Sequence, residues 1–284
     1  MEIIRDPKAM QEIAIDLFKR SRSVGFVPTM GALHDGHVSL VKASLHDNDE
    51  TIVSIFVNPT QFGPDEDLDD YPGSIDEDTK RLKSLHLDYL FLPKKEDIYP
   101  QNYLTYVEVQ GLTNRLCGLS RPTHFKGVTT VCSILFHLTL PTVAYFGQKD
   151  YQQTLVIEKL LKDLHFPITI KVMPIVRDKD GLALSSRNQY LSGNERISAL
   201  RINQSLEKAE HLIHEGERNV YILKKAITEH LSKSKDIHID YISICHPKTL
   251  IDLTQLTIGK VLIALSVYLG GTRLIDNRIV KLAN

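Results

Sequence analysis

The sequence predicts an α/β fold in which a doubly wound parallel sheet is followed by a smaller α+β domain. In the first 176 residues, apolar segments of strand length alternate with segments whose apolar residues recur at helical spacing, and such alternation is typical of βαβ units. Several of these strand candidates are nearly all apolar, as strands covered on both faces must be. Beyond residue 176, exposed amphipathic helices and half-buried strands replace this pattern. We therefore predict two domains, residues 1–176 and residues 177–284.

Helix starts are clear signals in the first domain. Asp6 followed by Pro7 is typical of an N-cap and a first helical residue, and apolar residues recur at helical spacing after them. Ser74 begins a Ser-Ile-Asp-Glu segment of capping-box form, which predicts another helix start. A short amphipathic helix is expected at Val38–Leu45.

Four strands are predicted around these helices. They are Val24–Val27, Thr51–Val57, Asp88–Leu92 and Thr142–Phe146. The last of them ends the longest apolar region of the chain, Val128–Phe146. Because His137 and Pro141 interrupt this region, a buried helix followed by a buried strand fits it better than a membrane span.

The second domain is predicted to contain two helices and two strands. The helices are expected at Asn194–Gly216 and Asn219–Ser234, which are amphipathic and polar on one face. The strands are expected at His238–Cys245 and Val261–Leu269, which alternate between apolar and polar residues as half-buried strands do.

The charge balance and the cysteines limit the classes of function. Lys and Arg number 34 against 35 Asp and Glu, a balance that gives no support to a nucleic-acid surface or a polybasic membrane patch. Cys117, Cys132 and Cys245 are far apart and lack metal-ligand spacing, so we interpret them as reduced thiols and expect no protein-built metal site. The N-terminal residues contain no signal-peptide core, and we expect a cytoplasmic protein.

The most informative segment is PTMGALHDGHVSL, residues 28–40, which lies between a predicted strand and a predicted helix. His34 and His37 are three residues apart, around Gly36. The first N–H groups of a helix have no internal partner and the helix dipole favours negative charge there, so this corner suits a phosphate. Imidazoles at this spacing can share one face of the turn and donate to phosphate oxygens. The alternative is that the two histidines only cap a surface turn, and neither a P-loop nor a GxGxxG pattern is present.

Four further segments carry polar side chains suited to the same chemistry. They are Val57–Phe62 with two amides, Arg121–Gly127 with clustered cations, Phe146–Gln153 with a lysine at a helix start, and Gly181–Asn188 with two serines and an arginine. Each alone is a weak signal, because the four segments are explained more simply as a turn, a solvated basic loop, a surface lysine and a polar linker. Together with the histidines, they provide donors for a triphosphate and for the charge that develops as it is displaced.

Six segments follow one another in a fixed order from about residue 22 to residue 278. They are PTMGALHDGHVSL, FVNPTQFGPDEDLDDYP, RPTHFKGVTTV, AYFGQKDYQQ, DGLALSSRNQYLS and GGTRLIDN. This series closely resembles the pantothenate synthetase, or pantoate–β-alanine ligase, family. The HxGH pattern alone would indicate only the wider nucleotidyltransferase superfamily, which includes class I aminoacyl-tRNA synthetases. Two alternatives stay open, an HxGH nucleotidyltransferase with another acceptor and a catalytically silent module that senses ATP.

The resemblance implies a Rossmann-like N-terminal domain, a smaller C-terminal lid domain and a cytoplasmic homodimer. It implies that the carboxylate of pantoate attacks the α-phosphate of ATP, giving pantoyl adenylate and pyrophosphate. The amine of β-alanine would then attack the acyl adenylate and release pantothenate and AMP. ATP is thus expected as a co-substrate, and the Mg²⁺ that the family needs is expected to be held mainly by the ATP phosphates.

The resemblance also assigns residues. The catalytic set would be His37, in the acid role, with His34, Lys149, Ser185, Ser186 and Arg187. The ATP site would comprise Met30, Gly31, Ala32, Leu33, His34, Asp35, Gly36, His37, Gly147, Gln148, Lys149, Asp150, Val176, Leu184, Ser185, Ser186 and Arg187. The other substrates, pantoate and β-alanine, would be held by Gln61, Gln153, Asn58 and Arg121.

Three positions depart from the family pattern. Gly73 stands where the family usually has arginine, Gln148 where it usually has glutamate, and His137 where asparagine is common. Loss of the arginine is expected to loosen the loop after Asn58 or to weaken a dimer contact. The glutamine changes the charge beside Lys149. None of the three is a residue assigned to phosphoryl transfer, so we expect an effect on the degree of activity only.

Overall fold

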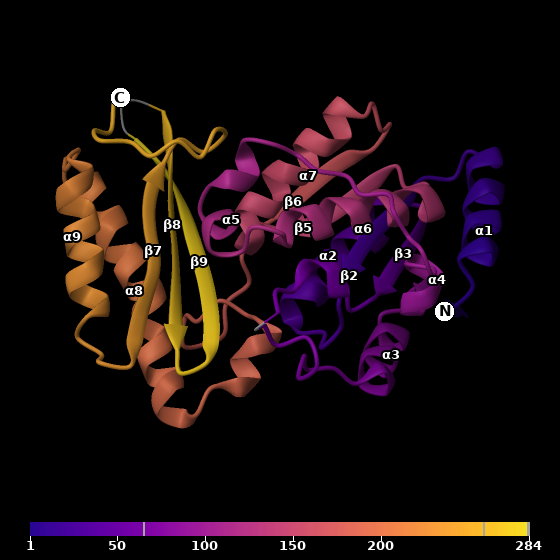
Figure 1. The fold of residues 1–284 in the computed structure, drawn as a ribbon, viewed down its shortest axis with the longest axis horizontal. Coiled ribbons are helices and arrows are strands. Elements are labelled where there is room, and N and C mark those ends of the chain that lie inside the picture. The colour runs from indigo at the N-terminus through magenta and orange to yellow at the C-terminus, as the bar shows by residue number, and fades with distance from the viewer. Residues whose placement is uncertain (65, 258, 283–284) are drawn as a thin grey trace.

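The computed structural model describes residues 1–64, 66–257 and 259–282. Within these ranges, six parallel strands form one sheet and three antiparallel strands form a second. The strands are β1 (Glu2–Ile4), β2 (Val24–Thr29), β3 (Glu50–Ile55), β4 (Tyr89–Phe91), β5 (Val143–Gly147), β6 (Thr169–Met173), β7 (Ile237–Cys245), β8 (Lys260–Leu269) and β9 (Thr272–Lys281). Figure 1 shows the smaller sheet at the left and the larger sheet at the right.

Helices connect and cover these strands. They are α1 (Pro7–Lys19), α2 (Asp35–Asp47), α3 (Ile75–Ser84), α4 (Lys95–Ile98), α5 (Cys117–Ser120), α6 (His124–Thr139), α7 (Tyr151–Asp163), α8 (Gly193–His214) and α9 (Val220–Leu231), with short 3-10 turns η1 (Pro59–Gln61), η2 (Leu112–Asn114), η3 (Gln148–Asp150) and η4 (Ser186–Tyr190). Asp6 caps α1 by accepting from the Lys8 N–H at 3.1 Å, and Ser74 caps α3 by accepting from the Glu77 N–H at 3.3 Å. Both predicted helix starts are therefore confirmed.

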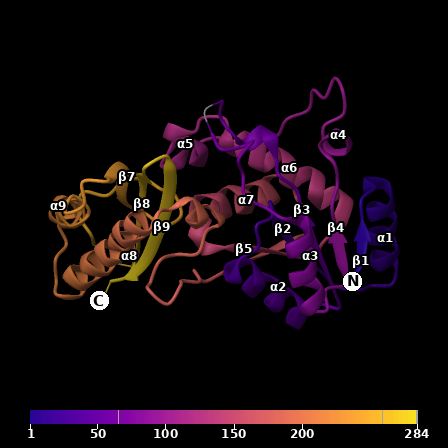
Figure 2. The same ribbon diagram turned by 90° about the horizontal axis from the view of Figure 1, so that it is seen from below.

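Helices lie on both faces of the large sheet, which confirms the predicted fold class (Figure 2). On one face, α1, α6 and α7 pack in a core that includes Phe26 of β2 and Ile52 of β3. On the other face, α2 and α3 pack in a core that includes the next residues along the same strands, Val27 and Val53. Because side chains alternate between the faces of a strand, a strand covered on both faces must be apolar at successive positions.

The order of strands in the large sheet places the site. That order is β1-β4-β3-β2-β5-β6. From β2 the chain moves outward to β3 and β4, and it returns as β5 on the other side of β2. At such a reversal, the connections leave the two central strands in opposite directions and open a crevice beyond their carboxyl ends. The segment with His34 follows β2 and the segment with Lys149 follows β5, so the two predicted phosphate-binding corners are neighbours.

The apolar region at residues 128–146 forms most of α6 and then β5, as predicted. Within the described residues, none of the helices combines the length and the apolar character that are needed to cross a bilayer. The start of α6 differs from its predicted place, because the helix begins at His124 rather than Val128. Gly127 lets this first turn approach η1 so closely that a Cβ would lie 2.3 Å from the carbonyl oxygen of Thr60.

The second half of the chain packs its sheet between two layers. Ile263 and Leu265 of β8 pack in a core with α8 and α9, whereas Leu262 and Ala264 point to the opposite face and pack with Leu155 of α7. The face of the small sheet that carries Leu262 and Ala264 therefore lies against the N-terminal half of the chain, as Figure 1 shows.

Three strands lie outside the predicted set. The strand β1 has only three residues, and β6 is an edge strand whose side chains are exposed or half-buried. The strand β9 carries the charged residues Arg273, Asp276 and Arg278, which break the apolar alternation expected of a strand. These charges pair with distant groups of the fold, so the local pattern does not show that the segment is extended.

Candidate active site

A cavity of about 870 Å³ lies at the crevice beyond β2 and β5, a volume typical of sites for small molecules. Its walls come from both halves of the chain, with the strand ends, α6 and α7 on one side and β9 on the other. The predicted site residues that line it are Met30, His34, Gly36, His37, Asn58, Gln61, Arg121, Gly147, Lys149, Asp150, Gln153, Val176, Leu184, Ser185, Ser186 and Arg187.

Five residues of the predicted ATP site do not line this cavity: Gly31, Ala32, Leu33, Asp35 and Gln148. Gly31 adopts a φ of +91°, and the N–H of Leu33 donates to the Asp78 carboxylate at 2.8 Å. Asp35 forms an ion pair with Arg81, and the amide of Gln148 donates to Asn277 of β9 at 3.3 Å. These residues therefore shape the corner without lining the cavity.

The two histidines cap the helix and face the cavity at once. His34 is the N-cap of α2, where its Nδ1 accepts from the Gly36 N–H at 3.1 Å, and Nδ1 of His37 accepts from the His34 N–H at 3.3 Å. A nitrogen that accepts carries no proton, so each neutral ring bears its proton on Nε2. The ring centroids are 4.0 Å apart. A Cβ at residue 36 would lie 2.8 Å from the His34 ring, which explains the glycine.

Burial keeps both rings neutral in the ligand-free protein. It lowers the pKa of His34 to about 2, with further contributions from His37, Lys149 and Arg81. It lowers the pKa of His37 to about 4, where Lys149 also lowers the value and Asp150 opposes it. A bound triphosphate would add negative charge and raise both pKa values. The rings are therefore neutral N–H donors until phosphate arrives.

These pKa values predict that the ligand-free protein loses stability as the pH falls below about 6.5. Between about pH 6.5 and pH 4, His34 and His37 are protonated in the unfolded chain but stay neutral in the folded chain. Each imidazole then lowers the free energy of unfolding by up to about 1.4 kcal/mol per pH unit. Urea unfolding at pH 7 and pH 5 measures this effect, and a variant with both histidines changed to glutamine should show a smaller pH dependence. An unchanged dependence in that variant would contradict the assignment.

Lys149 reaches the same cavity from the second corner. It lies in η3, directly after β5, and its half-buried side chain lines the cavity. Its positive charge lowers the pKa of both His34 and His37, so it is within electrostatic reach of both rings. Within the described part of the chain, no group forms a hydrogen bond or ion pair with its ammonium. The structure thus brings three donors from two corners to one cavity.

Asn58 and Gln61 differ in position although both line the cavity. Asn58 is 1% exposed, and its Nδ2 donates to Oε1 of Gln61 and to the carbonyl of Gly127, both at 3.1 Å. Its Oδ1 accepts from the Tyr99 hydroxyl at 2.8 Å. Nε2 of Gln61 lies 3.0 Å from Sδ of Met30, a weak acceptor. Asn58 therefore orients Gln61, whose amide N–H groups remain available to a ligand.

Two successive glutamines of α7 also differ. Gln152 is buried, and its Oε1 accepts from the Cys117 N–H at 3.0 Å. Its Nε2 donates to the carbonyls of Leu112 and Arg115 at 2.9 and 2.7 Å, so Gln152 anchors a loop. Gln153 lines the cavity, and its side chain makes no hydrogen bond to any residue that the structure describes.

Both predicted arginines are held by carboxylates, those of the adjacent residues Glu66 and Asp67. Nε of Arg121 donates to Glu66 at 2.6 Å, and Nε and a terminal nitrogen of Arg187 donate to Asp67 at 2.9 and 2.7 Å. An anionic ligand that uses the same nitrogens must displace these carboxylates. Glu66 and Asp67 are not among the predicted site residues, because an acidic run is typical of a solvated surface when its distant partners are unknown.

Tyr71 and His124 are further residues that the predicted site omitted. The hydroxyl of Tyr71 lies 3.0 Å from Oγ of Ser186, and Nδ1 of His124 lies 2.9 Å from the carbonyl oxygen of Gln61. Burial lowers the pKa of His124 to about 4, so its neutral ring can donate to that carbonyl. Both lie inside the segments that carry the family resemblance, which is the signal that could have found them.

The departures from the family pattern lie at the margin of the site or outside it. A Cβ at Gly73 would meet the nearest atom, the Ala32 nitrogen, at 3.7 Å, so this position has room for a larger side chain. His137 does not line the cavity, and its Nδ1 lies 2.7 Å from the carbonyl oxygen of Ser133 in α6. The activity is therefore not expected to depend on His137.

Comparison with known proteins places the whole chain in one family. The family model for pantoate-beta-alanine ligase matches residues 2–279. The chain is 47% identical to a pantothenate synthetase of Moorella thermoacetica and 48% identical to one of Acetivibrio thermocellus, in both cases over 99% of each chain.

Solved structures give the same result. Pantothenate synthetase of Thermus thermophilus is 39% identical with a TM-score of 0.92, over 98% of this chain and 99% of that one. Pantoate-beta-alanine ligase of Francisella tularensis, complexed with beta-gamma ATP and beta-alanine, is 37% identical with a TM-score of 0.80, over 98% and 97%. The chain therefore belongs to the pantoate–β-alanine ligase family.

Proposed function

We propose that the cavity between the two halves is where this enzyme binds its substrates and joins them. The family reaction is the ATP-dependent condensation of pantoate with β-alanine, which gives pantothenate, AMP and pyrophosphate. The observation that carries the proposed site is the meeting of His34, His37 and Lys149 with Gln61 and Gln153 in one cavity. The relative from Francisella tularensis supports a site for ATP and β-alanine.

The first step places the greatest demand on the donors. An oxygen of the pantoate carboxylate would bond to the α-phosphorus of ATP while the bond to the bridging oxygen breaks and pyrophosphate leaves. Because both reactants are anions, the step needs neutralisation, and charge grows on the leaving pyrophosphate. Nε2–H of His34, Nε2–H of His37 and the ammonium of Lys149 would stabilise that charge, with Ser185 and Ser186 as neutral donors.

The amides would hold pantoate through both steps. Gln61, oriented by Asn58, and Gln153 offer N–H donors and a carbonyl acceptor that suit the hydroxyls and carboxylate of pantoate. In the second step, the amine of β-alanine would attack the acyl carbon, and the bond to AMP would break. Arg187 would exchange Asp67 for a phosphate, and Arg121 would exchange Glu66 for a substrate carboxylate.

Mg²⁺ would be held mainly by the ATP phosphates. Within the described residues, no group of three or more His, Cys, Asp or Glu side chains is arranged to hold a metal ion. Mg²⁺ in nucleotide sites commonly keeps several waters and is bound by substrate phosphates and one or two carboxylates. Asp150, which lines the cavity beside Lys149, has the oxygen donors that Mg²⁺ prefers. When bound, the ion would neutralise phosphate charge.

Product analysis tests the proposed route. Purified protein supplied with ATP, Mg²⁺ and pantoate is expected to form AMP only when β-alanine is added, and pyrophosphate should accompany it. If ADP is the nucleotide product, the adenylate route is wrong. ATP binding without turnover would favour the silent sensor, and AMP formation with another acceptor would favour a different nucleotidyltransferase.

Replacing Gln153 with alanine is expected to raise the KM for pantoate more than the KM for ATP. Loss of one partner from a buried polar contact costs on the order of 1–3 kcal/mol, or about 5–150-fold in KM. Steady-state kinetics with each substrate varied measures the difference. Gln152→Ala is the neighbouring control. Gln152 also lines the cavity, but its buried amide is already bonded to backbone groups of Cys117, Leu112 and Arg115, so its loss should chiefly lower stability. A defect confined to ATP would remove Gln153 from the pantoate site.

We also propose the domain division at residues 176 and 177, with residues 177–284 as a lid, and a homodimer in the cytoplasm. The cavity is lined by both halves, which supports closure of one on the other. Hydrogen exchange at residues 181–188 is expected to slow when an ATP analogue is added. An unchanged exchange rate would mean that this segment is a static linker. Sedimentation equilibrium would give the mass of a single chain if the dimer proposal is wrong.

A further inference from the structure

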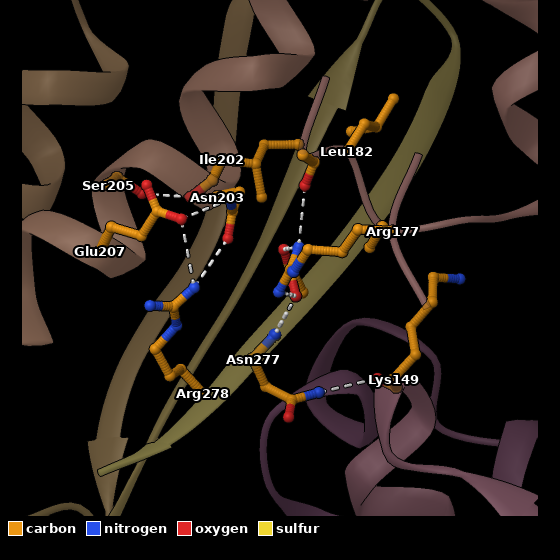
Figure 3. Close-up of polar contacts among 12 residues, drawn as sticks. Lys149, Arg177, Leu182, Ile202, Asn203, Ser205, Glu207, Asn277 and Arg278 are labelled. Atoms are coloured by element: carbon orange, nitrogen blue, oxygen red, sulfur yellow. Dashed lines mark hydrogen bonds and ion pairs between the residues drawn. The ribbon is translucent and has the colours of Figure 1, made fainter. Parts of the chain in front are cut away.

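The GGTRLIDN segment, which carries part of the family resemblance, has no role in the site described so far. In the structure it enters β9, and six of its eight residues line the cavity, Asp276 and Asn277 among them. Figure 3 shows Asn277 of β9 beside the turn that carries Lys149. Nδ2 of Asn277 donates to the carbonyl oxygens of Gln148 and Lys149 at 3.0 and 2.9 Å. Its Oδ1 accepts from Nε2 of Gln148 at 3.3 Å.

Asp276, the residue before Asn277, connects β9 to Arg177. Its carboxylate, 2% exposed, accepts from two nitrogens of Arg177 at 2.7 and 3.0 Å. It also accepts from the backbone N–H of Asn277 at 2.8 Å, which helps to hold that residue in place. A bidentate pair between guanidinium and carboxylate fixes direction as well as distance.

Arg177 connects this pair to the segment that carries the two serines. Its guanidinium donates to the carbonyl of Gly181 at 3.2 Å, and its backbone pairs with Ala183 in an antiparallel bridge. Ser185 and Ser186 follow directly. Two adjacent residues of β9 are thus bonded to the turn of Lys149 on one side and to the segment before Ser185 on the other.

The position of the Lys149 ammonium is set by the backbone of η3. This ammonium has no hydrogen-bond or ion-pair partner within the described residues, so no side-chain contact fixes where it points. The turn η3 has only three residues, and a short 3-10 turn is easily distorted. The amide of Asn277 spans two successive carbonyls of that turn and therefore restrains it.

We propose that Asn277 is a positioning residue that holds Lys149 for adenylate formation, with Asp276 and Arg177 fixing Asn277 relative to Ser185 and Ser186. This inference rests on the proposed role of Lys149. Asn277 lines the cavity, but its amide is bonded to the turn through the carbonyls of Gln148 and Lys149 and the amide of Gln148, so its proposed effect is exerted through that turn. A misplaced donor loses much of its effect on a transition state, since preorganisation is what makes it effective.

Single-turnover kinetics of both half-reactions tests the proposal. Asn277→Ala is expected to slow adenylate formation by about 10–100-fold and to leave aminolysis of supplied pantoyl adenylate nearly unchanged. In a Lys149→Ala background, the same change should add less than about 2-fold, because residues that act through one group are not additive. Full additivity of the two substitutions would overturn the proposal, and so would equal damage to both half-reactions.

Arg278 offers a matched control on the same strand. Its guanidinium points away from Lys149 to Asn203 and Glu207 of α8 (Figure 3). It also forms an ion pair with Glu210 of the same helix. Arg278→Ala removes polar contacts of β9 without touching η3, so it should lower thermal stability and leave the ratio of the two half-reactions unchanged. A ratio as altered as that of Asn277→Ala would show that any weakening of β9 has this effect, which contradicts a positioning role.

Two outcomes separate this inference from the proposed function. If Lys149→Ala itself has no effect on adenylate formation, the role of Lys149 fails first. If Lys149→Ala is damaging and folded Asn277→Ala is not, only the positioning role fails.

Asn277→Ser provides a second variant should the alanine variant not fold, because the serine hydroxyl is shorter than the amide and cannot bond both carbonyls. Its half-reaction rates should shift in the same direction, and unchanged rates would overturn the proposal.

Discussion

Replacing Lys149 with alanine is expected to slow formation of pantoyl adenylate by about 10²–10³-fold, the loss seen when one preorganised donor is removed from an active site. The ammonium lines the cavity and has no partner within the described residues, so it is available for the triphosphate. Charge grows on the bridging oxygen and on pyrophosphate as the α–β bond breaks, and a fixed cation gains strength along that path. ATP binding should therefore weaken much less than the rate.

The second half-reaction is the internal control for this prediction. Aminolysis of supplied pantoyl adenylate releases AMP and involves no pyrophosphate, so Lys149→Ala should largely spare it. Lys162→Ala, at an exposed position in the last turn of α7, is the matched control for loss of a lysine from the same region of the chain. Equal damage to the two half-reactions would mean that Lys149 shapes the site generally, and its assigned role would have to be withdrawn.

Replacing His37 with alanine is expected to slow adenylate formation by a similar factor, about 10²–10³-fold. Nδ1 of His37 accepts from the N–H of His34, which leaves Nε2–H as the ring's donor, and the residue lines the cavity. Because burial and Lys149 lower its pKa to about 4, the ring is a neutral donor before ATP binds. The phosphate charge then raises that pKa, which allows the imidazolium to form and to serve as an acid.

Two variants separate these properties of His37. His37→Gln keeps an N–H donor near the position of Nε2 but cannot become a cation at this pH. It should therefore retain more of the adenylation rate than His37→Ala, and its rate should lose the dependence on pH that an ionising imidazole confers. His46→Ala, on the exposed last turn of α2, controls for loss of a histidine from that helix. Equal rates for the alanine and glutamine variants would contradict a donor role for His37.

The location of the site followed from local signals combined with one topological rule. Apolar strands covered on both faces and the caps at Asp6 and Ser74 predicted a doubly wound sheet, because short-range sterics and capping bonds act within a few residues. Ligands in such sheets bind beyond the carboxyl ends of the strands. The segments with His34 and Lys149 follow two strands, so their meeting could be expected before the structure was known.

The sequence was less informative where a residue's role depends on distant partners. Glu66 and Asp67 belong to an acidic run that reads as solvated surface, yet they engage Arg121 and Arg187, which lie 55 and 120 residues away. Asn58 and Gln61 have the same residue class and lie in one segment, but only packing shows that one orients the other. No local pattern distinguishes these cases, because electrostatic and hydrogen-bonding partners are chosen by the tertiary fold.

By itself, the sequence determined the fold class, most of the helices and strands and the two corners that suit phosphate, because each of these depends on short-range periodicity, capping or motif spacing. The family followed from the resemblance of six segments to known members. The tertiary structure alone decided that β9 is a strand, that its Asn277 bonds to the turn of Lys149 128 residues earlier, and that the histidines are neutral in the ligand-free protein. Contacts across such separations and the burial that shifts a pKa exist only once the two halves have packed together.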